Sequence, residues 1–76
     1  MLILAEFEFE LGSNANIIYE SLIPELNQDY QRTRATLYLE HHKLILKITA
    51  QDIISMRAAL NGWLRLIRIA EEMCFI

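Results

Sequence analysis

The segment QDIISMRAALNGWLRLIRIAEEM, residues 51–73, contains more apolar side chains than a helix needs to cover one small sheet. Because successive helical residues lie about 100° apart, its polar side chains fall on one narrow stripe. That stripe consists of Arg57, Asn61, Arg65, Arg68 and Glu72. The apolar arc is about twice as wide as the stripe of roughly 100° that a surface helix buries. We therefore predict a long final helix with two apolar sides, of which its own sheet can cover only one.

The apolar arc of this helix divides into two halves that face different directions. The first half is formed by Met56, Leu60, Trp63 and Ile67. The second half is formed by Ala59, Leu66, Ile69 and Met73. The second half also carries small residues, which would let another helix approach closely: Ser55, Ala58, Ala59 and Gly62. Glycine inside a helix costs about 1 kcal/mol relative to alanine, and close packing would explain it. One alternative stays open: a single chain would bury both halves if the first helix covers the second half.

The composition favours an oligomer. The length of 76 residues predicts one domain over residues 1–76, and 54% of the residues are hydrophobic. A chain this short buries only about 60–65% of its unfolded surface, and self-association commonly buries an apolar excess. The formal net charge of −3 argues against an autonomous nucleic-acid binder.

Signals for secretion or membrane insertion are missing from the sequence, so we expect no membrane partner. Cys74 is the only cysteine, which excludes an intrachain disulfide and is typical of a reducing compartment. We therefore predict a cytoplasmic protein, or a nuclear one if the source is eukaryotic.

Three segments have the alternation of strands with one buried face. They are residues 2–11, 33–40 and 43–50, and His41-His42 forms a tight turn between the last two. On the polar face of these strands, glutamates at positions 6, 8, 10 and 40 are expected to form weak ion pairs with Arg34, Lys43 and Lys47.

A short helix is predicted between the first two strands. Ser13 or Asn14 can cap it, and it should end near Leu22 because Pro24 cannot continue the hydrogen-bond ladder. Residues 25–32 then form a polar connection. The capping candidates of the long final helix lie within residues 49–52.

The predicted order is β-α-β-β-α, an α+β fold. A right-handed crossover places both helices on one face of a three-stranded antiparallel sheet, with the first strand beside the third. With the apolar excess, this architecture predicts a homodimer.

Motifs for chemistry are missing. Gly12 and Gly62 are too few for a phosphate-binding loop, and Cys74 has no histidine positioned to activate it. His41 and His42 supply only two neighbouring metal ligands. We therefore predict no catalytic residue, no cofactor and no metal site.

The arginine stripe leaves two interpretations open. Arg57, Asn61, Arg65 and Arg68 form either a solvated edge or an accessory contact to RNA in a larger assembly. The open sheet face offers one aromatic residue, Tyr38, and no Gly-x-x-Gly loop is present. A stand-alone KH-like RNA-binding module and a small dimeric ligand-binding regulator remain alternative functions.

Residues 56–67, MRAALNGWLRLI, resemble the signature of the smallest core subunit of the KEOPS complex. Residues 22–25 (LIPE) and 44–52 (LILKITAQD) are similar to the pattern of the same family, which has L-antigen and cancer/testis-antigen relatives in animals. The resemblance spans nearly the whole chain. The turn at His41-His42 departs from it, because a turn with glycine or asparagine is expected there.

This resemblance implies a non-catalytic subunit of the machinery that forms threonylcarbamoyladenosine in tRNA beside the anticodon. It implies a homodimer that docks through its helices onto the ATP-binding transferase subunit, and indirectly onto the kinase and the remaining small subunit. The interface residues expected from the apolar helix faces are Ile18, Leu22, Met56, Ala59, Leu60, Trp63, Leu66, Ile67, Ile69 and Met73. The residues expected to help bind tRNA within the complex are Arg57, Asn61, Arg65 and Arg68.

Overall fold

The computed structural model describes residues 2–27 and 33–74. Its elements are, in order, β1 (Ile3–Glu10), the 3-10 turn η1 (Gly12–Asn14), α1 (Ala15–Leu22), the 3-10 segment η2 (Ile23–Asn27), β2 (Thr33–Glu40), β3 (Lys43–Ala50) and α2 (Ile53–Met73). The predicted α+β fold with the order β-α-β-β-α is confirmed. Residue 1, residues 28–32 of the predicted polar connection and residues 75–76 lie outside the described residues.

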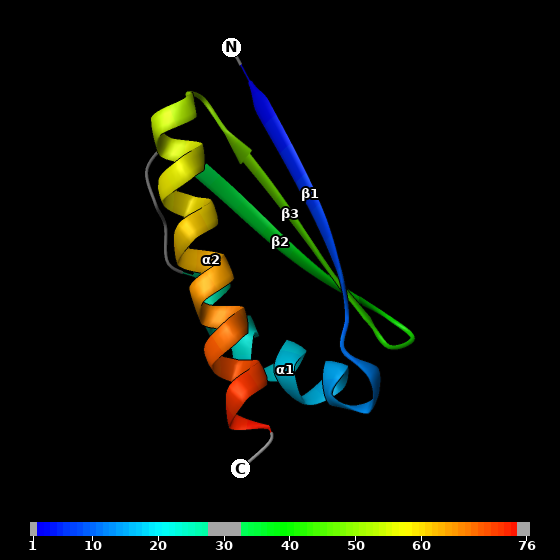
Figure 1. Ribbon diagram of the computed structural model, residues 1–76. Helices are drawn as coiled ribbons and strands as arrows, with labels where there is room; N and C mark the ends of the chain where they lie inside the picture. The colour runs from blue at the N-terminus through cyan, green and yellow to red at the C-terminus, as the bar shows by residue number, and fades with distance from the viewer. Residues whose placement is uncertain (1, 28–32, 75–76) are drawn as a thin grey trace.

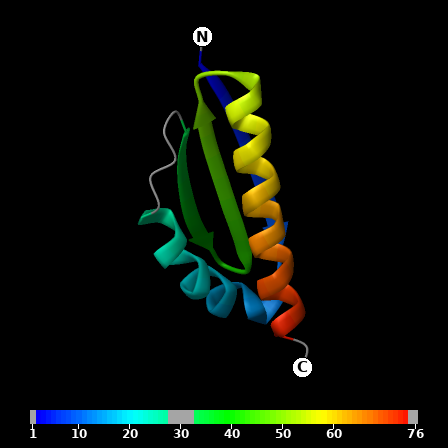
Figure 2. The same cartoon turned by 90° about the vertical axis from the view of Figure 1, so that its left-hand side faces the viewer.

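The sheet has the order β1-β3-β2, and both neighbouring pairs are antiparallel. The prediction that the first strand lies beside the third is therefore confirmed, with Phe7 and Leu37 both opposite Leu46 of the central strand. β1 is slightly shorter than predicted, because Gly12 adopts a φ of +61° where the chain enters η1. α2 runs along the sheet, and α1 lies near the C-terminal end of α2 (Figures 1 and 2).

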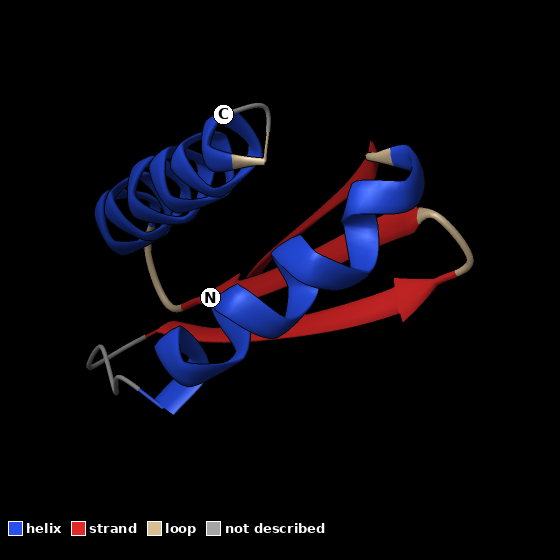
Figure 3. Ribbon diagram, turned by 90° about the horizontal axis from the view of Figure 1, so that it is seen from below, coloured by secondary structure: helices blue, strands red, loops and turns tan. Residues whose placement is uncertain are grey.

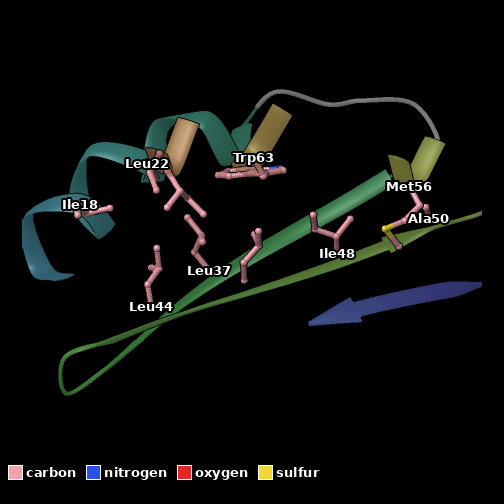
Figure 4. Close-up of a cluster of buried hydrophobic side chains, with 10 residues drawn as sticks. Ile18, Leu22, Leu37, Leu44, Ile48, Ala50, Met56 and Trp63 are labelled. Atoms are coloured by element: carbon pink, nitrogen blue, oxygen red, sulfur yellow. The ribbon is translucent and has the colours of Figure 1, made fainter. Parts of the chain in front are cut away.

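Both helices pack on the same face of the sheet. The central strand contributes Leu44, Leu46 and Ile48, each 0% exposed, to a core that receives side chains from both helices. Figure 4 shows Ile18 of α1 and Trp63 of α2 between the helices and the strands. Seen from below, α1 and η2 form a continuous helical segment that passes in front of the strands (Figure 3). One hydrophobic core therefore fixes the position of both helices.

The helix starts differ in how they are capped. The carboxylate of Asp52 accepts a hydrogen bond of 2.7 Å from the backbone N–H of Ser55, so the cap of α2 lies within the predicted range. Asp52 itself is extended, which is why α2 begins two residues later than residue 51. Asn14 is the N-cap of α1, but its side chain makes no capping hydrogen bond. That part of the capping prediction is wrong, because η1 leads directly into the helix.

The tight turn at His41-His42 is confirmed, and His41 adopts a φ of +57°. An L side chain in this left-handed region is strained, whereas glycine adopts it freely. His41→Gly is therefore expected to raise the free energy of unfolding by about 0.5–1 kcal/mol, measured by urea and thermal unfolding. His42 does not share the positive φ, so His42→Gly is the control and should be neutral or destabilising. Equal gains in both variants would contradict the strain.

Candidate functional site

A groove runs along α2 on the side that faces α1 and η2. It consists of two hollows of about 250 and 460 Å³, which share the side chains of Glu25 and Leu66 and so form one surface. Its α2 wall extends from Ser55 to Met73, about 27 Å at about 1.5 Å per residue. We call this surface the helical groove; the side chains that matter below are Ile17, Glu25, Ser55, Ala58, Ala59, Gly62, Leu66, Ile69 and Met73.

Small side chains create the first hollow of the helical groove. Ser55, Ala58, Ala59 and Gly62 line it from α2 and leave space beside η2. A β-carbon added at Gly62 would meet no atom within 4 Å, so the packing of the chain itself does not require glycine there. A residue that costs the helix about 1 kcal/mol is therefore unexplained within the chain, and a closely packed partner would explain it.

Large apolar side chains surround the second hollow. α1 has only eight residues and covers only part of the C-terminal half of α2. Ile17, Ile69 and Met73 are left 61%, 47% and 67% exposed. Clustered exposed side chains of this kind are typical of a surface that another molecule covers.

A second apolar surface lies beside β1. The helices pack over β2 and β3, so the helix-side face of β1 is only partly covered. On the flank of α2 opposite the helical groove, Ile53 and Leu64 are 60% and 39% exposed. We use the name β1 flank for the helix-side residues of β1 together with this flank of α2: Ile3, Ala5, Phe7, Phe9, Ile53, Leu60 and Leu64.

The polar stripe of α2 is exposed as predicted. Arg57, Asn61, Arg65 and Arg68 all lie on the solvent side of the helix. The Nε of Arg68 donates to Oε1 of Glu72 at 3.2 Å, and both side chains are largely exposed. An exposed pair of this kind contributes only about 0.3–0.5 kcal/mol, so Arg68 can exchange Glu72 for another anion at little cost.

Ion pairs join β1 and β3 on the open face of the sheet, as the alternation of charges predicted. Lys47 lies 3.5 Å from Glu6, and Lys43 lies 3.8 Å from Glu10. Within residues 2–27 and 33–74, no three His, Cys, Asp or Glu residues are grouped to hold a metal ion. The same part of the chain contains no helix with the length and hydrophobicity of a membrane span.

Comparison with known proteins identifies the family. The family model described as "Transcription factor Pcc1" matches residues 4–74, which include both helices, β2, β3 and all of β1 except Ile3. The chain belongs to the Pcc1 family. The KEOPS complex subunit Pcc1 of Pyrococcus abyssi (strain GE5 / Orsay) is 33% identical over 66 residues, covering 86% of this chain and 80% of that protein. The resemblance to the small KEOPS subunit is confirmed, and that to animal L-antigen proteins stays a prediction.

The predicted interface residues of this Pcc1-family chain fall into two sets. Five of them are core residues of the single chain: Ile18, Leu22, Met56, Trp63 and Ile67. Their burial leaves little area for a partner, but Ile18, Leu22 and Trp63 also line the helical groove, and the place of all five in an interface stays a prediction. The remaining five line or border the helical groove or the β1 flank: Ala59, Leu60, Leu66, Ile69 and Met73.

The Pcc1 fold also exposes interface candidates that the sequence analysis missed. Leu64, which lies next to Arg57 and Arg68 on a helical projection, is absent from the predicted interface residues. Ile17 of α1 is absent from them too, and it is mostly exposed. Glu25 was assigned to a polar connection, and only the turn of η2 places it in the helical groove.

Proposed function

We propose that this chain is the non-catalytic dimerisation and adaptor subunit of a KEOPS complex, which forms threonylcarbamoyladenosine in tRNA next to the anticodon. One copy binds a second copy through the β1 flank and binds the ATP-binding transferase subunit through the helical groove. The kinase and the remaining small subunit then join indirectly. The observation that carries this proposal is the pair of apolar surfaces on opposite flanks of α2.

The helical groove suits helices of the transferase subunit. Its α2 wall offers about 27 Å, or five helical turns, for a partner helix. The small side chains at Ala59 and Gly62 allow close approach, while Ile69 and Met73 supply apolar area. Each large side chain that becomes fully buried contributes about 1.5–3 kcal/mol before the costs of association.

The β1 flank suits a second copy of the chain. β1 ends the sheet, so its outer backbone edge has no strand partner among residues 2–27 and 33–74, and such an edge tends to pair with another chain. The partly covered Phe7 and Phe9 lie beside this edge. A second copy presents the same edge and the same side chains, so one two-fold symmetric contact covers both.

A KH-like RNA-binding module is the main alternative, and the family description names a transcription factor. A net charge of −3 and three exposed glutamates on β1 disfavour unaided binding to nucleic acid. A dimeric ligand-binding regulator would instead need a pocket enclosed between two copies. Filter binding of tRNA to the chain alone, at two salt concentrations, distinguishes the KH-like module from the adaptor. Submicromolar affinity without partners would favour the KH-like module.

Light scattering of the chain, alone and with the transferase subunit, tests the adaptor function. We expect the mass of two copies for the chain alone and of two chains with two transferase subunits for the mixture. A chain that stays monomeric at every concentration and binds no transferase would overturn the proposal.

Charge reversal on the arginine stripe is expected to weaken tRNA binding by the assembled complex. Arg57→Glu and Arg68→Glu should each lower the affinity about 3- to 10-fold and reduce the salt slope by about 1, because each loses one phosphate contact. Assembly should not change, since the stripe lies outside both apolar surfaces. Arg34→Glu on the open sheet face makes the same change of charge away from the helices and is the control. Unchanged tRNA affinity in the stripe variants would assign these residues to a solvated edge.

A further inference from the structure

Glu25 is the only charged side chain among the described residues that line the helical groove. The 3-10 segment η2 places it there, because Glu25 lies in the first turn of η2 directly after Pro24. It borders both hollows together with Leu66 of α2, and it is half-buried. A single carboxylate therefore stands near the middle of an otherwise uncharged groove.

No described residue neutralises Glu25. The ion pairs within residues 2–27 and 33–74 lie on the open sheet face and along the polar stripe of α2, and none includes Glu25. The side-chain hydrogen bonds of the same residues do not involve its carboxylate either. Within the part of the chain that the structure describes, only water is left to solvate this charge while the groove is open.

A partner that fills the helical groove removes that water. An ionised carboxylate in an apolar contact is strongly unfavourable unless a cation and hydrogen-bond donors replace the lost solvent. The described side chains around Glu25 provide no cation, because Thr33, Ser55 and Trp63 offer only neutral donors and the other lining residues of the first hollow are apolar or small. The replacement has to come from the partner.

We infer that the helix seated in the helical groove carries a lysine or arginine near its middle, and that this side chain pairs with Glu25. This inference rests on the proposed function, because it names the chemistry of the transferase segment that fills the groove. Glu25 lies where the two hollows meet, with Gly62 in one and Ile69 in the other. Apolar residues one turn before and one turn after the basic residue should therefore also face the groove.

The charge pair would decide which helix binds and in which register. A helix shifted by one turn would place its own cation against apolar side chains and leave Glu25 without a partner. Both charges would then be buried unpaired, which is how interfaces reject a wrong partner or register. Glu25 is therefore a specificity-determining residue of the helical groove.

Calorimetric titration of the complete chain with the transferase subunit tests the inference. Glu25→Gln keeps the shape of the side chain but leaves the partner's cation without a counter-charge. We expect its Kd to rise about 10- to 30-fold, and that of Glu25→Lys to rise further. Glu20→Gln changes an exposed glutamate of α1 outside the groove and should bind as the wild type. Added salt should weaken wild-type binding more than Glu25→Gln binding.

Charge exchange supplies the second measurement. In the Glu25→Lys background, reversing one lysine or arginine of the docking helix to glutamate should restore binding to within several-fold of the wild type. Equal affinities of the wild type and Glu25→Gln would overturn the inference. Gly62→Leu, which fills the groove without changing its charge, separates this failure from another. If that variant also binds normally, the groove is not the docking site of the transferase subunit, and that assignment within the proposed function fails instead.

Discussion

Gly62→Leu is expected to stabilise the isolated chain while weakening its complex with the transferase subunit at least about 100-fold, or about 2.7 kcal/mol. Leucine is a better helix former than glycine by about 0.5–1 kcal/mol. A β-carbon at this position meets no atom within 4 Å, and the rest of a leucine side chain can extend into the open first hollow that Gly62 lines. In the complex the same side chain occupies space that a partner helix needs, and overpacking costs about 1–3 kcal/mol or more. Thermal unfolding measures the first effect and calorimetric titration the second.

Two further substitutions control the Gly62→Leu experiment. Glu72→Leu places the same side chain on the polar stripe of the same helix and should leave the affinity unchanged. Gly62→Ala adds only one carbon and should fall between the wild type and Gly62→Leu. Opposite effects on stability and on binding exclude a general loss of fold. Wild-type affinity in Gly62→Leu would show that no helix packs against this part of α2.

The β2–β3 hairpin could be predicted residue by residue from the sequence. Both strands alternate strictly, and a turn of only two residues fixes their register, so β2 and β3 have the predicted bounds. The long helix could be predicted equally well apart from its first two positions. There, hydrogen bonding by Asp52 decides where the helix begins.

The two apolar surfaces could be predicted only in part. A helical projection gives the direction of each side chain of α2, but not how far the sheet and α1 reach around it. Leu66 and Ile67 are adjacent in the sequence, yet Ile67 is 3% exposed while Leu66 borders the helical groove. The partial cover of β1 depends on both helices lying over the other two strands, which is a property of the packed fold.

Under the proposed function, the positions of the two surfaces would let one small chain serve as an adaptor. The helical groove and the β1 flank lie on opposite flanks of α2, so a partner on one need not displace a partner on the other. The core side chains Trp63 and Ile67 lie between them and keep the flanks apart. Substitutions on one flank should therefore leave binding at the other flank intact.

Leu64→Asp is expected to convert dimers into monomers, with a dimer dissociation constant at least about 1000-fold higher, or about 4 kcal/mol. Leu64 is 39% exposed and lies outside the core, so the change spares the fold. A two-fold symmetric contact contains every substitution twice. Only the exposed part of each leucine is left for the dimer to bury, so the loss of about 0.6–1.2 kcal/mol per leucine is doubled. The larger cost is that two carboxylates enter an apolar contact.

Light scattering over a range of concentrations measures the dimer, and circular dichroism checks the fold. Ile54→Asp is the control, because Ile54 is 83% exposed on a part of α2 outside both surfaces, and this variant should stay dimeric. Leu64→Asp should still bind one transferase subunit with wild-type affinity, since the helical groove is on the other flank. If instead Gly62→Leu breaks the dimer and Leu64→Asp blocks the transferase, the two surfaces exchange their partners. The adaptor function would then survive with its assignment reversed, because it requires only that the flanks bind independently.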